Sequence, residues 1–217
     1  MSNPHTPYKK AFAKITAEKR LRILDTATGV FAEKGFVGAN INIIAREAGV
    51  SIGAMYNYFD TKEDLFLTVI DHLHDFLEQG LVSVVREDMG FFDAVETMIR
   101  EAVAGAVSHR EKTILYLNTT AEHIDGLSER LSRKMEGVTI EFYRNMAQRA
   151  VVTGELPPDT DTAMLSFIID NQIVALQRAY ATPYHESRMK LFLEDETGPD
   201  QVIPRVMKAL RGAAGIL

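Results

Sequence analysis

The segment from Asn40 to Leu65, NINIIAREAGVSIGAMYNYFDTKEDL, limits the possible folds more than any other part of the chain. Ile41 and Ile44 recur at helical spacing, which predicts a short helix with a narrow apolar stripe. Gly49 ends this helix, because glycine readily takes the left-handed conformation that helix C-termini commonly need. Ser51 then predicts a second helix, since its hydroxyl can accept a hydrogen bond from a first-turn amide. Two helices joined by so tight a turn predict a helix-turn-helix unit.

The second helix of this unit, residues 52–58, has a slim side. Gly53 and Ala54 have almost no side chain, which weakens a helix but lets another surface approach its backbone closely. Met55 and Phe59 are four residues apart, and we expect them to face inward. In a helix-turn-helix unit the second helix lies in the major groove of DNA, so we expect the slim side to meet DNA.

The candidate DNA contacts lie on this helix and next to it. Tyr56 and Tyr58 can present hydroxyl groups to phosphate, although aromatic residues at helical spacing are more often part of a core. Asparagine can pair with adenine through two hydrogen bonds, and small or apolar side chains can touch the methyl group of thymine. The predicted contacts are Asn40, Asn42, Ser51, Ile52, Gly53, Ala54, Tyr56, Asn57, Tyr58 and Lys62.

A further helix begins directly after the unit. Thr61 can cap it, and Asp64 three residues later resembles a capping box. Lys62 lies in the first turn, where the helix dipole disfavours a cation unless an anion is close. A DNA phosphate would supply that anion. A solvated lysine beside Glu63 is the alternative interpretation.

Upstream, residues 17–34 predict an amphipathic helix that packs the motif. Thr16 can cap its start, and Gly35 ends it. Asn40 is then placed to cap the first helix of the helix-turn-helix unit. The apolar positions of the upstream helix are Leu21, Leu24, Ala27 or Thr28, and Phe31.

These residues together resemble the signature of the tetracycline-repressor (TetR) family of bacterial regulators, over about the first third of the chain. The resemblance implies that Phe59 faces inward whereas Tyr56 and Tyr58 face outward. It also implies a homodimer and an effector pocket in the remaining helices. Asn42 and Ile52 depart from the charged or longer polar residues that other members often have, so the operator sequence cannot be carried over. The matching residues are Ile23-Leu24, Ala27, Phe31, Gly35-Phe36, Ile44-Ala45, Ala48-Gly49-Val50-Ser51, Gly53, Tyr56, Tyr58-Phe59, Lys62-Glu63 and Leu65.

Charge is distributed unevenly along the chain. Residues 1–62 carry nine Lys and Arg against five Asp and Glu, whereas residues 63–217 carry 15 against 25. A basic end attracts phosphate and an acidic body repels it, so we expect the N-terminal end to approach DNA. Lys9, Lys10 and Lys14 could belong to an arm that reaches DNA, or to a flexible tail that only aids solubility.

Beyond Leu65 the sequence predicts further helices and no strands. We therefore predict an all-α fold with a flexible basic arm at residues 1–16, a three-helix DNA-binding domain at 17–61, and a helical effector-binding and dimerisation domain at 62–217. The predicted helices are 66–86, 91–109, 111–123, 127–152, 159–181 and 201–212, separated by glycine and proline breaks.

The predicted helix at 159–181 contains MLSFIIDNQIVAL, which is apolar almost all round. Such a helix must be covered on both sides. A second copy of the chain, paired about a two-fold axis with the last helix, would supply the second cover. Asp170, Asn171 and Gln172 interrupt the apolar run and could be interface hydrogen bonds or ligand contacts.

An effector pocket is harder to place. Polar and aromatic residues within apolar helices could orient a small, largely apolar molecule in a hydrophobic cavity, or could equally be core hydrogen bonds and packing. The candidate effector contacts are Tyr116, Asn118, Thr119, Phe142, Phe167 and Asn171.

Several function classes are disfavoured. The chain has no cysteine, its histidines lack metal-ligand spacing, and no nucleophile elbow or phosphate-binding loop occurs, so we expect no metal, no cofactor and no enzyme activity. No run is long enough to cross a bilayer and no apolar signal segment occurs, so we expect a cytoplasmic protein without membrane contact.

Two functions remain. The favoured one is a ligand-responsive regulator, a repressor that binds a palindromic double-stranded operator as a homodimer and is released by a small effector. The alternative is a helical small-molecule-binding or scaffolding protein whose helix-turn-helix unit no longer reads DNA.

Overall fold

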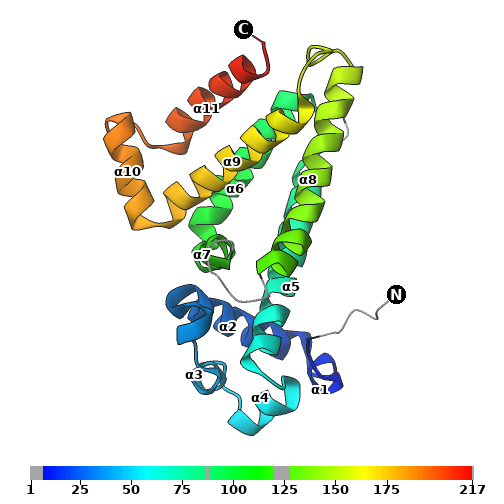
Figure 1. Cartoon of the computed structure of the whole chain (residues 1–217). Coiled ribbons are helices and arrows are strands. Elements are labelled where there is room, and N and C mark those ends of the chain that lie inside the picture. Colours follow the sequence, from blue (N-terminus) through cyan, green and yellow to red (C-terminus); the bar gives the residue numbers. More distant parts are fainter. Residues whose placement is uncertain (1–6, 87, 120–127, 217) are drawn as a thin grey trace. The chain divides into compact units, whose positions relative to one another are not determined.

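The computed structural model describes residues 7–86, 88–119 and 128–216, apart from the side chains of residues 74, 76–84 and 128–138. Within these ranges the chain forms eleven helices and no strand, which confirms the predicted all-α class (Figure 1). The chain divides into two compact units, Met1–Phe76 and Leu77–Leu217.

The first unit contains four helices and the beginning of a fifth. Aromatic rings pack its centre, where Phe66 lies 5.0 Å from both Phe31 and Phe36 between ring centroids. Gly35, with a φ of 66° and a ψ of 172°, kinks the second helix at the residue predicted to end it, and one more turn continues to Gly38. The helices are α1 (Lys10–Ala13), α2 (Ala17–Gly38), α3 (Ile41–Glu47), α4 (Ile52–Tyr58) and α5 (Lys62–Val84).

Side-chain caps fix where these helices begin, as predicted. The amide of Lys19 donates to Thr16 Oγ1 at 3.3 Å at the start of α2. The amide of Asn42 donates to Asn40 Oδ1 at 2.8 Å at the start of α3. Each cap satisfies an amide that has no partner inside its own helix.

The predicted capping box of α5 is also present. The amide of Thr61 donates to Asp64 Oδ2 at 3.0 Å, and the amide of Asp64 donates to Thr61 Oγ1 at 3.0 Å. This reciprocal pair satisfies two amides at once, so the helix that follows the helix-turn-helix unit has a fixed start.

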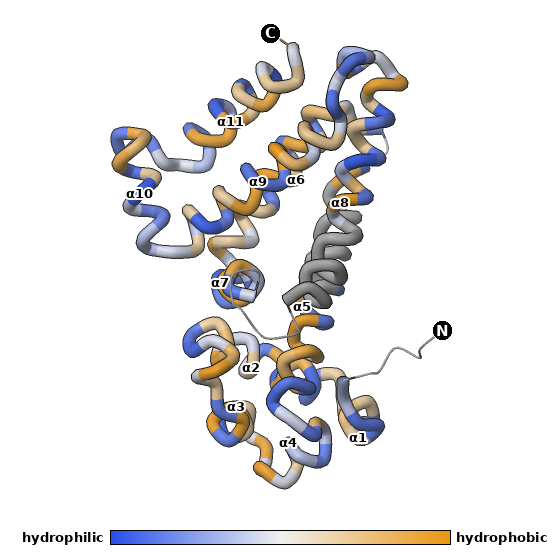
Figure 2. The backbone as a smooth tube through the Cα atoms, in the orientation of Figure 1, coloured by the Kyte–Doolittle hydropathy of each residue, from blue (hydrophilic) through white to orange (hydrophobic). Residues whose placement is uncertain are grey.

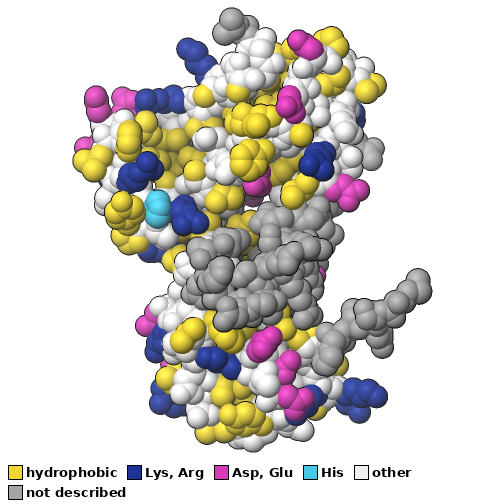
Figure 3. Space-filling model, in the orientation of Figure 1, with side chains coloured by type: hydrophobic (Ala, Val, Ile, Leu, Met, Phe, Trp, Pro, Cys, Tyr) yellow, Lys and Arg dark blue, Asp and Glu magenta, His cyan; other side chains and the backbone are white. Residues whose placement is uncertain are grey.

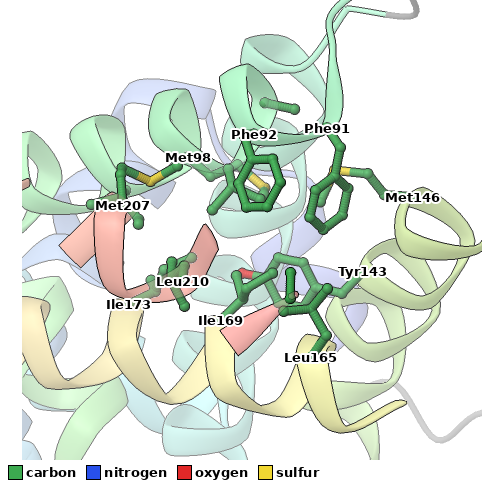
Figure 4. Packing of buried hydrophobic residues seen from close by; sticks show 14 of the residues in the cluster. Phe91, Phe92, Met98, Tyr143, Met146, Leu165, Ile169, Ile173, Met207 and Leu210 are labelled. Carbon is green, nitrogen blue, oxygen red and sulfur yellow. The ribbon is translucent and has the colours of Figure 1, made fainter. Parts of the chain in front are cut away.

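The second unit is built around α9, which contacts α6, α7, α8, α10 and α11. Its core is apolar and is drawn from α6, α8, α9 and α11 (Figure 4). The labelled core residues are Phe91, Phe92, Met98, Tyr143, Met146, Leu165, Ile169, Ile173, Met207 and Leu210. The helices are α6 (Phe91–Ser108), α7 (Arg110–Thr119), α8 (Ser128–Val152), α9 (Thr162–Ala181), α10 (Pro183–Leu193) and α11 (Pro199–Ala213).

Two helices were not predicted. Pro183 lies in the predicted break between the helices at 159–181 and 201–212, but it is the first residue of α10, a position where the missing amide of proline costs no hydrogen bond. Residues 10–13 were expected in a flexible arm and instead form α1, while residues 1–6 lie outside the described residues. The predicted helix 111–123 is observed to Thr119, and its remainder also lies outside the described residues.

Within the described part of the chain, no helix is long and apolar enough to span a bilayer. The same residues contain no group of three or more His, Asp or Glu side chains placed to hold a metal ion.

Candidate nucleic-acid interface

The turn between α3 and α4 closes with the hydrogen bonds of a Schellman motif. Gly49 has a φ of 64°, the left-handed conformation predicted for it. The amide of Val50 donates to the carbonyl of Ala45 at 2.9 Å, and that of Gly49 donates to Arg46 at 3.2 Å. Ser51 Oγ then accepts from the amide of Ala54 at 3.1 Å. The turn therefore fixes how α4 leaves α3.

The α4 helix has one buried and one open side. Met55 and Phe59 are fully buried, as predicted, whereas Tyr56 is 48% exposed and Asn57 is exposed. A Cβ atom added to Gly53 would meet no described atom within 4 Å. Packing within the described chain therefore does not explain the slim side of α4, which leaves room for an outside surface.

Most of the predicted DNA contacts lie at the surface of the first unit. Ile52 is about half exposed, and Ala54 is half-buried. Two of the predicted contacts, Asn40 and Ser51, use their side-chain oxygens as helix caps. The exposed members of the set are Asn40, Asn42, Ser51, Ile52, Gly53, Tyr56 and Asn57.

The prediction that Tyr58 points outward is wrong, because this residue is only 6% exposed. Its ring lies 5.7 Å from that of Phe12 on α1 and 6.4 Å from that of Phe59. Lys19 Nζ lies 5.7 Å from the centroid of the same ring. The short α1 helix packs against Tyr58, and a helix of four residues is too short to leave a periodic pattern in the sequence.

Lys62 is not placed as expected either. Its ammonium donates to the carbonyls of Val37 and Ala39, both at 3.1 Å, and lies 4.7 Å from the centroid of the Phe36 ring. Both carbonyls follow the kink at Gly35, one in the last turn of α2 and the other on its extended cap residue, Ala39. The anionic partner predicted for Lys62 is thus replaced, in the free protein, by backbone carbonyls of another helix.

This arrangement recurs at every helix from α1 to α4. At the C-terminal end of each of these four helices, backbone carbonyls accept a hydrogen bond from a cationic side chain outside the helix. Four of the nine Lys and Arg residues in 1–62 are used in this way, and sequence analysis missed these roles because most of the pairs are distant in sequence. The pairs are Arg20 with Ala13, Lys62 with Val37 and Ala39, Arg22 with Ala48, and Lys9 with Tyr56.

The candidate effector residues of the second unit differ in how deeply they are buried. Thr119 is buried and its hydroxyl donates to the carbonyl of Leu115 at 2.7 Å. The amide of Asn171 donates to the carbonyl of Phe167 at 2.7 Å, and both residues are exposed. The first two polar groups are therefore satisfied within their own helices. The other candidates, Tyr116, Asn118 and Phe142, are half-buried.

An apolar groove of roughly 400 Å³ lies between α9 and α11. Gln172 and Arg205 are the polar residues of its lining, and the others are apolar, including Ile168, Leu193, Val202 and Val206. Figures 2 and 3 show hydrophobic residues along α9 and on the face of the second unit that carries α9, α10 and α11.

The exposed side of α9 adds to this apolar surface. Phe167 is 64% exposed and Met164 is about half exposed. Asp170, on the same helix, is half-buried, and burial raises the pKa of its carboxyl above the ordinary value. The α9 helix thus keeps large apolar side chains exposed, although five other helices contact it.

The sequence of this chain is similar to those of bacterial transcriptional regulators. Residues 23–69 match the family model described as bacterial regulatory proteins, tetR family. The HTH-type transcriptional regulator UidR of Escherichia coli K12 is 28% identical over 151 residues, which cover 69% of this chain and 75% of UidR.

Two solved structures share the fold across both units. GusR of Salmonella enterica superposes with a TM-score of 0.70 at 19% identity, covering 93% of this chain and 99% of GusR. The regulator FadR of Bacillus subtilis, solved in complex with stearoyl-CoA, gives a TM-score of 0.69 at 16% identity, covering 91% of this chain and 99% of FadR.

Proposed function

The chain belongs to the tetR family of bacterial regulatory proteins, and from this premise we propose that it is a ligand-responsive repressor that binds a palindromic operator as a homodimer. The observation that carries the proposal is the open, slim side of α4, where a Cβ at Gly53 would meet no described atom. A short helix fixed at both ends, with one bare side, suits close approach to a DNA groove. Such a protein acts by binding, without catalysis, in the cytoplasm where the operator lies.

The exposed residues of the helix-turn-helix unit divide by chemistry. Asn42 and Asn57 can pair with adenine, and Ile52, Gly53 and Ala54 can lie against thymine methyl groups. Tyr56 can donate its hydroxyl to a phosphate. We leave out Tyr58, because its ring is buried. Asn40, Ser51 and Lys62 border the interface, and their polar groups hold the helices that form it.

The homodimer rests on the second unit. The groove between α9 and α11, together with exposed Met164 and Phe167, offers an apolar surface that a second copy can cover. A two-fold axis through this surface would pair two helices from each chain as a four-helix interface. Two recognition helices would then read the two halves of a palindrome.

The effector is proposed to act through the second unit. It can shift the protein away from operator binding only if it binds the two states with different affinity. Half-buried Tyr116, Asn118 and Phe142 remain the proposed contacts, whereas exposed Phe167 and Asn171 fit the dimer surface better. Because FadR was solved with stearoyl-CoA, acyl-CoA thioesters of graded chain length are the first probes to test.

Fluorescence anisotropy with the promoter DNA upstream of the protein's own gene tests the central claim. We expect sequence-selective binding that weakens steeply with salt, because cations released from DNA drive association. If no binding occurs even at low salt, the alternative of a helical small-molecule-binding or scaffolding protein is preferred. Addition of an effector is expected to release the labelled operator, and tighter binding on addition would reverse the proposed direction of control.

A further inference from the structure

The last turn of α4 is held by residues that precede the DNA-binding helices in sequence. The amide of Lys9 donates to the carbonyl of Tyr58 at 2.9 Å. The ammonium of the same residue donates to the carbonyl of Tyr56 at 2.8 Å and pairs with Asp60 at 2.5 Å. One residue thus makes three contacts with the end of α4 and the residues that follow it.

Aromatic packing strengthens this attachment. Phe12 on α1 is 1% exposed, and its ring centroid lies 4.8 Å from that of Phe59 and 5.7 Å from that of Tyr58. The ring of Tyr8 also packs against Phe12, with 5.4 Å between the ring centroids. The segment from residue 8 to residue 13 therefore shares a small aromatic core with the C-terminal end of α4.

The attachment matters because α4 has only seven residues. A helix this short has little stability of its own, and the carbonyls of its last turn have no amide partners within the helix. Ser51 and the preceding turn fix its N-terminal end. The cation of Lys9 satisfies the opposite end, where the helix dipole also favours positive charge. Tyr56 and Asn57 lie in the turn that Lys9 holds.

We propose that Lys9 and Phe12 are positioning residues that keep the last turn of α4, and with it Tyr56 and Asn57, in the geometry that binds DNA. The proposal rests on the proposed DNA-binding function. It gives Lys9 a different role from the phosphate contact or soluble tail that its sequence position suggested, because its ammonium is occupied by Tyr56 and Asp60.

Salt dependence separates the two roles. A lysine that contacts phosphate releases a counterion, so its loss reduces the slope of log affinity against log salt by about one. A positioning lysine changes affinity for the operator at every salt concentration and leaves that slope nearly unchanged. It also leaves the affinity for random DNA nearly unchanged, because non-specific binding depends little on the placement of base-reading side chains.

The experiment compares Lys9→Met with Lys10→Met, an adjacent exposed lysine, and with Lys9→Arg, using operator and random duplexes over a salt series. We expect Lys9→Met to weaken operator binding about 5- to 20-fold, with the salt slope changed by clearly less than one. Lys9→Arg should recover most of the loss, because arginine can also donate to carbonyls. A slope reduced by about one with equal losses on both duplexes, or wild-type affinity, would overturn the proposal.

Hydrogen exchange of the DNA-free protein provides a readout that does not depend on the operator. Lys9→Met and Phe12→Leu are both expected to speed exchange of the amides of residues 56–59 about tenfold, while the core amides of α2 stay protected. Unchanged exchange in both variants would also overturn the proposal. If wild-type protein bound no DNA, the proposed function would fail, and the exchange rates would still show whether Lys9 and Phe12 hold α4.

Discussion

The two compact units expose different kinds of surface. The first unit exposes small and amide-bearing residues along α4, such as Gly53 and Asn57. The second exposes large apolar side chains, among them Phe167 on α9 and Leu191 on α10, which is 85% exposed. The α10 helix has no buried residue at all.

This difference indicates two different partners. A surface of small and amide-bearing side chains fits the hydrated, negatively charged groove of DNA, where hydrogen bonds and close approach contribute to binding. A broad apolar surface is stabilised when another apolar surface removes it from water. Both units have an apolar core, and in the first unit cationic side chains also bind the carbonyls at the ends of α1 to α4.

Phe167→Glu should have the largest effect, because it would place a carboxylate in the proposed dimer surface, where burial of an unpaired charge costs several kcal/mol. We expect the dimer to weaken at least about 100-fold and operator binding to fall with it. Sedimentation velocity measures the dimer. Val107→Glu, at another exposed apolar position, is the matched control and should not change sedimentation. A Phe167→Glu protein that remains dimeric would place the interface elsewhere.

Tyr56→Ala should weaken operator binding about 10- to 100-fold, because it removes both the hydroxyl and the ring from the exposed side of α4. Tyr56→Phe separates the two contributions, since it removes the hydroxyl alone. Anisotropy measures binding, and sedimentation should show an unchanged dimer. Wild-type affinity in Tyr56→Ala would remove this residue from the interface.

Lys62→Met should lower the free energy of unfolding by about 1–2 kcal/mol, because two carbonyls at the end of α2 lose a charged donor. Urea denaturation measures the change, and exposed Lys34→Met is the control. A stability equal to wild type, together with a salt slope lower by about one, would instead support the phosphate contact predicted from the sequence.

Gly53→Ala should separate stability from binding. Alanine is the better helix former by about 0.5–1 kcal/mol, and its methyl group would enter open space, so we expect the protein to become more stable. The same methyl group should weaken operator binding several-fold, because it would keep the DNA groove farther from the backbone of α4. Urea denaturation and anisotropy give the two values. Equal or tighter operator binding would show that DNA does not approach α4 closely at this position.

Asp170→Asn should have the smallest effect, and it should depend on pH. Burial raises the pKa of Asp170, so the folded chain binds this proton more tightly than the unfolded chain does. The ionised carboxylate therefore lowers stability at neutral pH, and this penalty fades as pH falls through the raised pKa toward 3.8. We expect the variant to melt at a higher temperature at pH 7, with a smaller difference at pH 4.5. A lower melting temperature at pH 7 would indicate that the carboxylate is paired.

The local features of the first unit could be predicted from the sequence. Thr16, Asn40 and Ser51 cap helices that start within three residues, and Gly49 ends a helix through its own backbone. Such interactions need no knowledge of the rest of the chain. The spacing of Met55 and Phe59 also predicted that they share one side of α4, because residues four apart lie on the same face of a helix.

Features that depend on distant parts of the chain could not be predicted. Tyr58 is buried because Phe12, 46 positions earlier, covers it, and a four-residue helix leaves no periodic pattern. Lys9 and Lys62 were assigned to solvent or DNA because charge patterns do not show which carbonyls lie nearby. In the second unit, Pro183 starts α10, and the sequence alone does not distinguish a proline that breaks a helix from one that begins it.

Three of the cations that end helices of the first unit, Arg20, Arg22 and Lys62, donate to backbone carbonyl oxygens, which carry no formal charge to oppose theirs. Their field extends about 8–10 Å through physiological salt, far enough to draw a polyanion inward without touching it. We therefore expect Arg20, Arg22 and Lys62 to affect how fast the protein reaches a promoter, whereas the exposed side of α4 determines how long it stays there.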